Sequence, residues 1–295
     1  MEFDIVGIRI ITATWFVKFR TSLRNLSFRN GHKVSQMVPK LYRTFYERRV
    51  FTLEDAAPFF PDSQQARNAI HYMKAHGYLK QIKAGLYCVI PFEFQGKEDY
   101  SPDLILIGSH LVEPYFFSHL TALHIYGFVD IPLPRIVVTS TKRFRRFTFQ
   151  ERIFQNVLTN DFFGFRTHPY KENLEVYVSD LERTFIDCLN RLELAGGMVR
   201  FFRAMYSFGF LNYLLLIEYL QKIGNKTLMA KVGFTFDYLS GRWEVPSDII
   251  DELKKMIAGD TVFYLDRNIA KGFGELNKDW NLVIPKSFRE LVRPV

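Results

Sequence analysis

Apolar residues recur at every third or fourth position from residue 37 onward, which is the spacing of one face of an α-helix. The stripe consists of Met37, Val38, Leu41, Tyr42, Phe45 and Tyr46. After it, Thr52 is suited to cap a short second helix, and Pro58 and Pro61 are suited to end it. The pattern therefore predicts two helices in this part of the chain.

The segment PDSQQARNAIHYMKAHG predicts a third helix with two unlike faces. Asp62 and Gln65 have the spacing of a capping box, and Gly77 stands where a C-terminal glycine is expected. One face is apolar and is expected to pack against the core; it consists of Ala66, Ala69, Ile70 and Met73. The opposite face is polar and contains no acidic residue; it consists of Gln64, Arg67, Asn68, His71 and Lys74.

The next residues, YLKQIKAGLYCVI, form two β-prone runs around a Lys-Ala-Gly turn, which is the pattern of a hairpin. Three helices followed by a hairpin predict a winged helix-turn-helix domain over residues 37–92. Gln, Asn and Arg side chains match the hydrogen-bonding groups of base edges, and lysines neutralise phosphates. We expect base contacts from Gln64, Gln65, Arg67, Asn68 and His71, and phosphate contacts from Lys74, Lys80 and Lys83. A winged helix that binds only protein is the alternative.

Helical and strand patterns alternate over residues 93–295, which predicts a mixed α/β second domain. Strand patterns occur in RIVVTST, RFTFQERIFQNV, EVYVSD and WNLVIPKSF. Helical patterns occur in PDLILIGSHL, SHLTALHIYGF and LERTFIDCLN, and residues 198–224 are interpreted as two helices about Gly209. Residues 89–102 show no period and are interpreted as a linker or the opening of the second domain.

The net charge of +8 lies entirely in the N-terminal part of the chain. Residues 1–92 contain 14 Lys or Arg against 6 Asp or Glu, whereas residues 93–295 contain 25 of each. A basic module joined to a neutral one favours a first domain that binds a polyanion. Residues 1–36 show no clean period, so we expect an N-terminal extension that is poorly ordered or a translation artefact, with the native start at Met37.

The remaining composition predicts a cytoplasmic protein. Cys88 and Cys188 each lie in an apolar run and are expected to be buried free thiols, which fits a reducing compartment. The longest apolar stretch, residues 210–220, carries Glu218 and is shorter than the roughly 20 residues that a membrane span needs. The acidic start, followed later by basic residues, reverses the charge order of a signal peptide.

The stretch SHLTALHIYG raises the question of a metal or catalytic site. On a helix, residues five apart lie about 140° from each other around the axis, so His119 and His124 cannot share a ligand face. Ser118 is expected to cap this helix and Gly127 to end it. The motif therefore predicts a helix that belongs to the fold.

The stretch VSDLERTFIDC has the same character. Ser179 and Glu182 have the spacing of a capping box, and Arg183 with Asp187 has the spacing of an ion pair across one helical turn. No stretch of the sequence therefore indicates a metal site, a cofactor or an active site, and we expect a protein that is not an enzyme.

A nuclease-like, DNA-processing enzyme is the alternative from another class. Pro102 and Asp103, together with the strand VVTSTK, resemble part of such a site. Ser140 stands where a second carboxylate is needed, so a Mg²⁺ ion would lose a ligand on which it depends.

A cluster of cations interrupts the otherwise neutral second domain in the segment TKRFRRF. Its members are Lys142, Arg143, Arg145 and Arg146. We expect a second phosphate contact, a docking surface for an acidic partner, or a solvated hairpin loop.

The segments GYLKQIKAGLYCVIP, YFFSHLTALHIYGF, VVTSTKRFRRFTF, VYVSDLERTFIDCLNRLELAGG and WNLVIP together resemble the AbiEi-type antitoxins, which are transcriptional regulators of type IV toxin–antitoxin and viral-defence loci. The resemblance extends over about residues 40–290. It implies a winged N-terminal domain that represses its own operon and a C-terminal domain that counteracts a nucleotidyltransferase-like toxin. Ser118 and His119 would then define the fold. The implied partners are double-stranded operator DNA with inverted repeats, bound by a monomer or weak dimer, and the cognate toxin.

Overall fold

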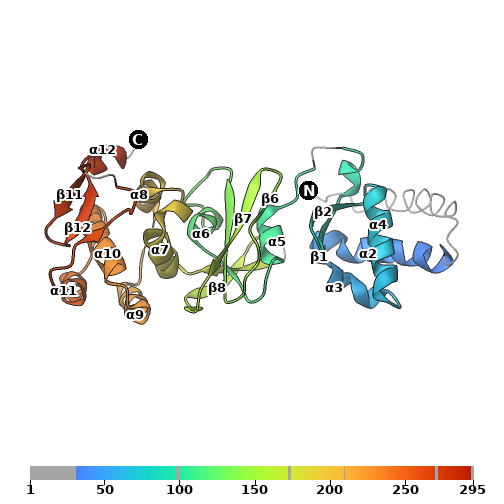
Figure 1. Cartoon of the computed structure of the whole chain (residues 1–295), viewed down its shortest axis with the longest axis horizontal. Coiled ribbons are helices and arrows are strands. Elements are labelled where there is room, and N and C mark those ends of the chain that lie inside the picture. Colours follow the sequence, from blue (N-terminus) through green and yellow to red (C-terminus); the bar gives the residue numbers. More distant parts are fainter. Residues whose placement is uncertain (1–30, 98–99, 172–173, 209, 270–271, 294–295) are drawn as a thin grey trace, which may run out of the picture. The chain divides into compact units, whose positions relative to one another are not determined.

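The computed structural model describes residues 31–97, 100–171, 174–208, 210–269 and 272–293, and it shows a mixed α/β protein, as predicted (Figure 1). The chain divides into two compact units between His110 and Leu111. Most of the predicted N-terminal extension, residues 1–30, lies outside the described residues. Its last six residues, 31–36, begin the first described helix, which therefore starts six residues before Met37.

Unit 1, the part of the chain up to His110, contains helices and a three-stranded sheet. Its described elements are α2 (Gly31–Arg48), β1 (Val50–Thr52), α3 (Leu53–Ala56), the 3-10 helix η1 (Ala57–Phe59), α4 (Ser63–Ala75), β2 (Leu79–Lys83), β3 (Leu86–Val89), η2 (Phe92–Phe94) and α5 (Leu104–Ser109). The three helices and the hairpin expected between residues 37 and 92 are all present.

The helix starts of unit 1 follow the predicted caps. Thr52 accepts a hydrogen bond from the backbone N–H of Asp55 at 3.1 Å, and the Asp55 carboxylate accepts one from the Thr52 N–H at 2.7 Å. Asp62 caps α4 by accepting from the Gln65 N–H at 2.8 Å. Gly77 follows α4 with a φ of +72°, a backbone conformation that favours glycine.

The core of unit 1 lies between α2, α4 and the sheet. The rings of Phe45 and Phe51 stack with centroids 4.3 Å apart. The predicted apolar face of α4 is buried in this core; it consists of Ala66, Ala69, Ile70 and Met73. The sheet order is β1-β3-β2 with both pairs antiparallel, and Cys88 on the central strand is a buried free thiol, as predicted.

The division between the units falls eighteen residues beyond the boundary expected at 92/93. Aromatic packing accounts for the difference. Phe92 packs on Tyr42 of α2 with ring centroids 5.0 Å apart, and the Gln95 amide donates to the Tyr42 hydroxyl at 3.2 Å. Farther along, Tyr100 packs on Phe94 at 5.3 Å. The segment interpreted as a linker is therefore part of the first unit.

Unit 2 is built on a six-stranded mixed sheet. Its strands are β4 (Phe116–Phe117), β5 (Arg135–Ser140), β6 (Phe147–Phe149), β7 (Arg152–Leu158), β8 (Phe165–Pro169) and β9 (Glu175–Ser179), in the order β6-β7-β5-β4-β9-β8. The pairs β5/β7 and β4/β9 are parallel and the other three are antiparallel. Residues 136–140 of β5 are all buried, as expected for a central strand.

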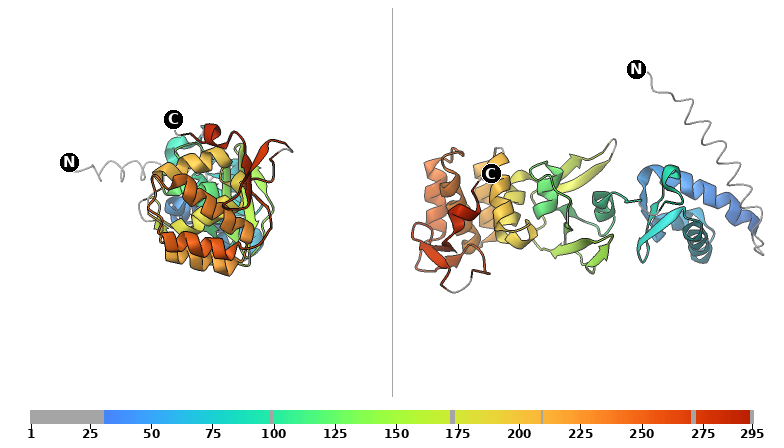
Figure 2. Two further views of the ribbon diagram at one scale, coloured as in Figure 1. Left: turned by 90° about the vertical axis from the view of Figure 1, so that its left-hand side faces the viewer. Right: turned by 90° about the horizontal axis from the view of Figure 1, so that it is seen from above.

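Helices and a small second sheet complete unit 2. The elements are α6 (His119–Ile125), α7 (Leu181–Asn190), η3 (Leu192–Leu194), α8 (Met198–Ser207), α9 (Tyr213–Ile223), α10 (Lys226–Leu239), α11 (Ser247–Met256), β10 (Phe263–Tyr264), β11 (Gly274–Asn277), β12 (Leu282–Pro285) and α12 (Phe288–Leu291). Helix α7 contacts α6 on one side and α9 and α10 on the other, and the orange and red elements gather beyond it (Figure 2).

Helix α10 is the central helix of this end of unit 2, and ten of its fourteen residues are buried. Gly233 lets the Trp280 ring lie directly on the helix, because an added Cβ would fall 2.0 Å from the ring. The indole N–H of Trp280 donates to the Asp237 carboxylate one turn farther along. Within the described ranges, no helix is long and apolar enough to cross a membrane.

Candidate nucleic-acid interface and a buried polar network

Helix α4 presents to solvent the polar face that the sequence predicted. Gln64, Arg67, Asn68 and His71 are exposed, and Gln65 is half-buried. The Gln64 amide donates to the Asn68 Oδ1 at 3.0 Å, which holds two of these side chains together along the helix. No acidic residue occurs within α4, so its polar face carries only neutral or cationic groups.

The Gln65 side chain binds the residue that caps α4. Its amide nitrogen donates to the Asp62 carboxylate at 2.8 Å, in addition to the backbone bond between the same two residues. These two bonds hold the pKa of Asp62 below its ordinary value. The Gln65 side chain is therefore engaged in the helix start, and the other four polar residues are better placed to contact a ligand.

One of the three predicted lysines connects α4 to the hairpin. Lys74 donates to the Gln81 Oε1 on strand β2, and Gln81 is an exposed residue that sequence analysis did not select. Lys80 donates to the backbone carbonyl of Tyr100 at 3.4 Å. Burial lowers the pKa of Lys83, which is half-buried. Strand alternation does not single out Gln81, because residues 79 and 81 would share a face and the register shifts between Gln81 and Lys83.

The second basic cluster lies on the connection between β5 and β6 in unit 2. Its cations are exposed; they are Lys142, Arg143, Arg145 and Arg146. The backbone N–H of Lys142 donates to the Ser140 Oγ at 3.0 Å, which anchors the start of the segment to the buried strand. The cluster is thus a solvent-exposed group of cations in a segment whose first residues are anchored to strand β5.

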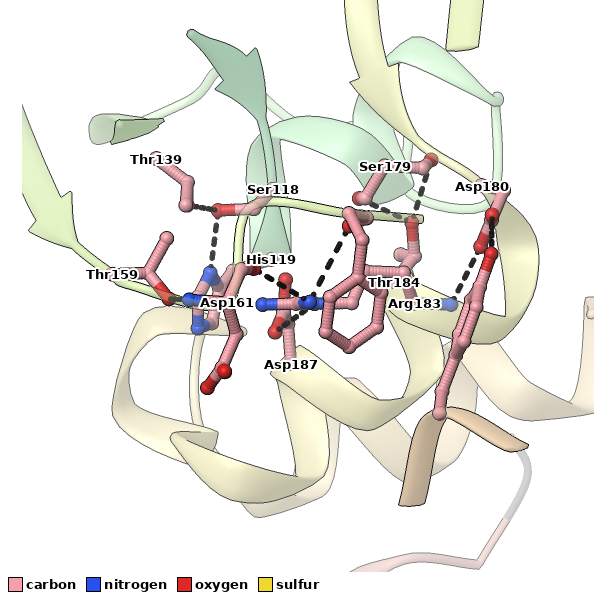
Figure 3. A network of polar contacts seen from close by, with 12 residues as sticks. Ser118, His119, Thr139, Thr159, Asp161, Ser179, Asp180, Arg183, Thr184 and Asp187 are labelled. Carbon is pink, nitrogen blue, oxygen red and sulfur yellow. Dashed lines mark hydrogen bonds and ion pairs between the residues drawn. The ribbon is translucent and has the colours of Figure 1, made fainter. Parts of the chain in front are cut away.

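The motif SHLTALHIYG builds one half of a buried polar network (Figure 3). The Ser118 Oγ lies 2.7 Å from the His119 Nδ1 and 2.7 Å from the Thr139 Oγ1 on β5. Ser118 occupies the predicted N-cap position of α6, but its side chain makes these contacts instead of a cap bond. Burial, and then the Arg191 and Arg183 charges, lower the pKa of His119 to about 3, so this imidazole is neutral near pH 7.

The motif VSDLERTFIDC builds the other half, and one prediction about it was wrong. Asp180, not Ser179, caps α7, because its carboxylate accepts from the Arg183 N–H at 2.8 Å. Ser179 is the last residue of β9, and its Oγ lies 2.7 Å from the Thr184 Oγ1. The Glu182 carboxylate, assigned to the same capping box, accepts from the Asn212 N–H at 2.7 Å.

The predicted ion pair between Arg183 and Asp187 is confirmed, with Nε and Oδ1 2.9 Å apart and both side chains at least nine-tenths buried. Arg183 also donates to the carbonyl of Asp161 at 3.0 Å (Figure 3). Its guanidinium lies over the Phe163 ring, 4.7 Å from the ring centroid. Burial raises the pKa of Asp187, although Arg183 opposes the shift. The pair thus ties α7 to the loop that follows β7.

The network has the character of a structural core. His119 and Arg183 are almost fully buried, and they bind Ser118 and Asp187, which are other residues of the fold. Among the described residues, no group of three or more His, Cys, Asp or Glu could hold a metal ion. The residues considered for a nuclease are engaged elsewhere, since Asp103 caps α5 and the Ser140 Oγ donates to the Pro114 carbonyl at 2.6 Å.

Comparison with known proteins shows the fold alone. No family model matches the chain, and no curated protein matches it. Among solved structures, the chain is similar to the RV2827C protein from Mycobacterium tuberculosis, with a TM-score of 0.56 at 16% sequence identity. The match covers 85% of this chain and 90% of that chain, which is more than either unit contains, so the shared fold includes parts of both units.

Proposed function

We propose that the chain is a sequence-specific DNA-binding repressor whose first unit is a winged helix-turn-helix domain. One observation carries the proposal: the thirteen-residue helix α4, which contains no acid, presents Arg67, Asn68 and His71 to solvent and is followed by an antiparallel hairpin. Amide and guanidinium groups on one exposed helix face match the hydrogen-bonding pattern of base edges in the major groove.

The end of α4 and the hairpin supply the proposed contacts to the DNA backbone. Lys74 lies at the C-terminal end of α4 beside Gln81, and Lys83 ends strand β2. Cations at these positions would neutralise phosphates on either side of a groove that holds α4. Residues 37–92 contain eight Lys or Arg against four Asp or Glu, so the proposed winged-helix segment has the charge that this role requires.

A mobility-shift titration tests the proposal. The full chain is titrated onto its own upstream DNA and onto random DNA of equal length, at two salt concentrations. We expect tighter binding to the upstream DNA, with inverted half-sites occupied by monomers or a weak dimer, and weaker binding at the higher salt. Equal binding to both DNAs would exclude sequence reading, and metal-dependent cleavage would favour the enzyme alternative.

Arg67→Ala tests the base contact. It should cost roughly 1–3 kcal/mol on the upstream site with little change on random DNA, because a base contact carries sequence information. Lys83→Gln should weaken binding to both DNAs to a similar extent, because a phosphate contact carries no sequence information. Arg203→Ala, an exposed arginine on α8, is the matched control. An equal loss on both DNAs for Arg67→Ala would contradict the base-reading role.

We further propose that unit 2 acts in the cytoplasm as an antitoxin domain against a nucleotidyltransferase-like toxin. The support is the resemblance carried by SHLTALHIYG and SDLERTFIDC, since both motifs contribute to one buried network. Co-expression of the full chain with a toxin encoded beside it should restore growth. Failure to restore growth, while operator binding persists, would remove the antitoxin role and leave the repressor.

A further inference from the structure

Two cavities in unit 2 meet at one buried lysine. The larger has a volume of about 570 Å³, and its lining includes Asn190, Arg191, Glu193, Lys231, Arg267 and Asn268. The smaller, of about 390 Å³, shares Asn190, Lys231 and Arg267 and adds Tyr264 of β10. Both volumes fall within the range of small-molecule sites in proteins.

Lys231 is a charged residue in an unusual position. It lies on α10, is 7% exposed, and donates to the carbonyl of Leu189 at 3.0 Å. Within the described part of the chain, no carboxylate oxygen lies within 4.0 Å of its ammonium. Burying an ammonium ion without a carboxylate in direct contact is costly, and its three hydrogens can serve more than the one carbonyl. A ligand anion in the cavity would supply both needs.

The groups around Lys231 are suited to a phosphate. Arg267 is exposed at the cavity and presents a guanidinium, which binds phosphate oxygens in pairs. Asn190 and Asn268 add amide donors on the same lining. Arg191 has its Nε 2.9 Å from Glu193, so this cation is already paired. Lys231 and Arg267 are therefore the cations that can meet a ligand.

The two carboxylates on the lining narrow the ligand class. Glu193 and Asp266 border the larger cavity, and carboxylates accept hydrogen bonds from hydroxyl groups. A lining of cations, amides and carboxylates thus fits a molecule that carries both a phosphate and hydroxyl groups. Tyr264 is 51% exposed beside the smaller cavity, where a ring attached to such a molecule could lie against it.

We infer that the cavity lined by Lys231 and Arg267 binds a phosphate-bearing small molecule. The site belongs to unit 2, whereas α4 and the hairpin belong to unit 1, so the inference does not rest on the DNA-binding proposal. The phosphate lies between Lys231 and Arg267, and the hydroxyl-bearing part lies toward Glu193 and Asp266. A duplex backbone is a poorer fit, because the lysine is buried at the cavity and a rigid helix of DNA cannot enter it.

Calorimetric titration of the full chain tests the site with ribose 5-phosphate, inorganic phosphate and adenosine 5′-monophosphate. We expect ribose 5-phosphate to bind and free ribose not to bind. Inorganic phosphate binding equally well would identify the ion itself as the ligand, and tighter binding of the nucleotide would identify a nucleotide. Either result supports a phosphate site. Succinate binding in place of all three phosphates would overturn it.

Variants assign the binding to the cavity. Lys231→Met and Arg267→Gln should each weaken ribose 5-phosphate binding by a factor of ten or more, and Lys278→Gln, an exposed lysine outside both linings, should leave it unchanged. Arg267 is exposed, so its replacement does not endanger folding. Equal binding to wild type and both cavity variants, or displacement of the ligand by random duplex DNA, would overturn the inference.

Discussion

Acid should destabilise unit 2 through one buried histidine. His119 is 2% exposed, and burial lowers its pKa to about 3. In the unfolded chain a histidine takes up a proton near pH 6.5. Between these two values the unfolded state binds the proton and the folded state does not, so stability falls as the pH is lowered through this window. Above about pH 7 this group contributes no pH dependence.

The magnitude follows from the size of the window. Each pH unit below 6.5 costs about 1.4 kcal/mol, so lowering the pH to about 5 should cost about 2 kcal/mol of unfolding free energy from this group alone. Replacing His119 by Asn removes the titration. Asn also tolerates the left-handed backbone that His119 adopts, with a φ of +53°. The difference between wild type and variant cancels the contributions of other titrating groups.

Urea unfolding at the two pH values, followed by tryptophan fluorescence, measures the effect. Trp243 and Trp280 are both buried in unit 2 and report its unfolding. Trp15 lies outside the described residues and is replaced by Phe in all samples. We expect His119→Asn to lose about 2 kcal/mol less than wild type on acidification. His124→Asn, on the same helix, is the matched control. Equal losses in wild type and His119→Asn would refute the reasoning.

Three further changes test the packing and charges of unit 2. Gly233→Ala should lower stability by about 1–3 kcal/mol or more, because its Cβ would lie 2.0 Å from the Trp280 ring; an unchanged melting temperature would contradict this contact. Arg183→Met should cost about 3–5 kcal/mol at neutral pH, because it leaves the buried Asp187 carboxylate without its cation. That cost should shrink in acid urea titrations, since burial raises the pKa of Asp187 and protonation removes the charge. Burial lowers the pKa of Lys231 to about 8, so wild type should lose stability as the pH falls from about 10.5 to about 8; Lys231→Met should lack this slope in thermal melts, and its persistence would contradict the burial.

Local sequence patterns predicted the features that depend on neighbours along the chain. The caps at Thr52 and Asp62 and the pair between Arg183 and Asp187 each involve residues within one helical turn, and all three are present. The prediction that Ser179 is the cap was wrong because its hydroxyl contacts Thr184 and donates to the Phe117 carbonyl on the neighbouring strand β4. A local sequence pattern does not indicate the contact with Phe117. Long-range contacts thus decide between adjacent candidate caps.

The sequence analysis did not predict strands β1, β4, β8, β10 and β11, and two of them have a similar explanation. β4 has two residues and β8, FRTHP, is mostly polar at the edge of the sheet, so neither shows an apolar alternation. Both acquire their conformation from pairing with β5 and β9. The same holds for the unit boundary, where contacts of Phe92 with α2 outweigh the linker-like composition of the segment.

The two candidate sites differ in how far the sequence could reveal them. The polar face of α4 follows from helical periodicity, so its exposed residues could be predicted. The cavity combines Asn190, Lys231 and Arg267, which come from three separate segments with no common spacing. Lys231 lies in a largely apolar helix. Its burial results from the packing of α10 against α7, which the sequence alone does not indicate.

The pairing of β1 with β3 has a consequence for how unit 1 would meet a partner. The hairpin supplies the central strand β3 and one edge strand, β2, of a three-stranded sheet, and β1 pairs with β3 and joins the sheet directly to the end of α2. Backbone hydrogen bonds therefore hold the hairpin in place beside α4, and Lys74 adds a side-chain link through Gln81. The loss of conformational entropy that a free hairpin would suffer on association has already occurred during folding. Association should accordingly proceed as the docking of a preformed surface, without a slow ordering phase in stopped-flow records.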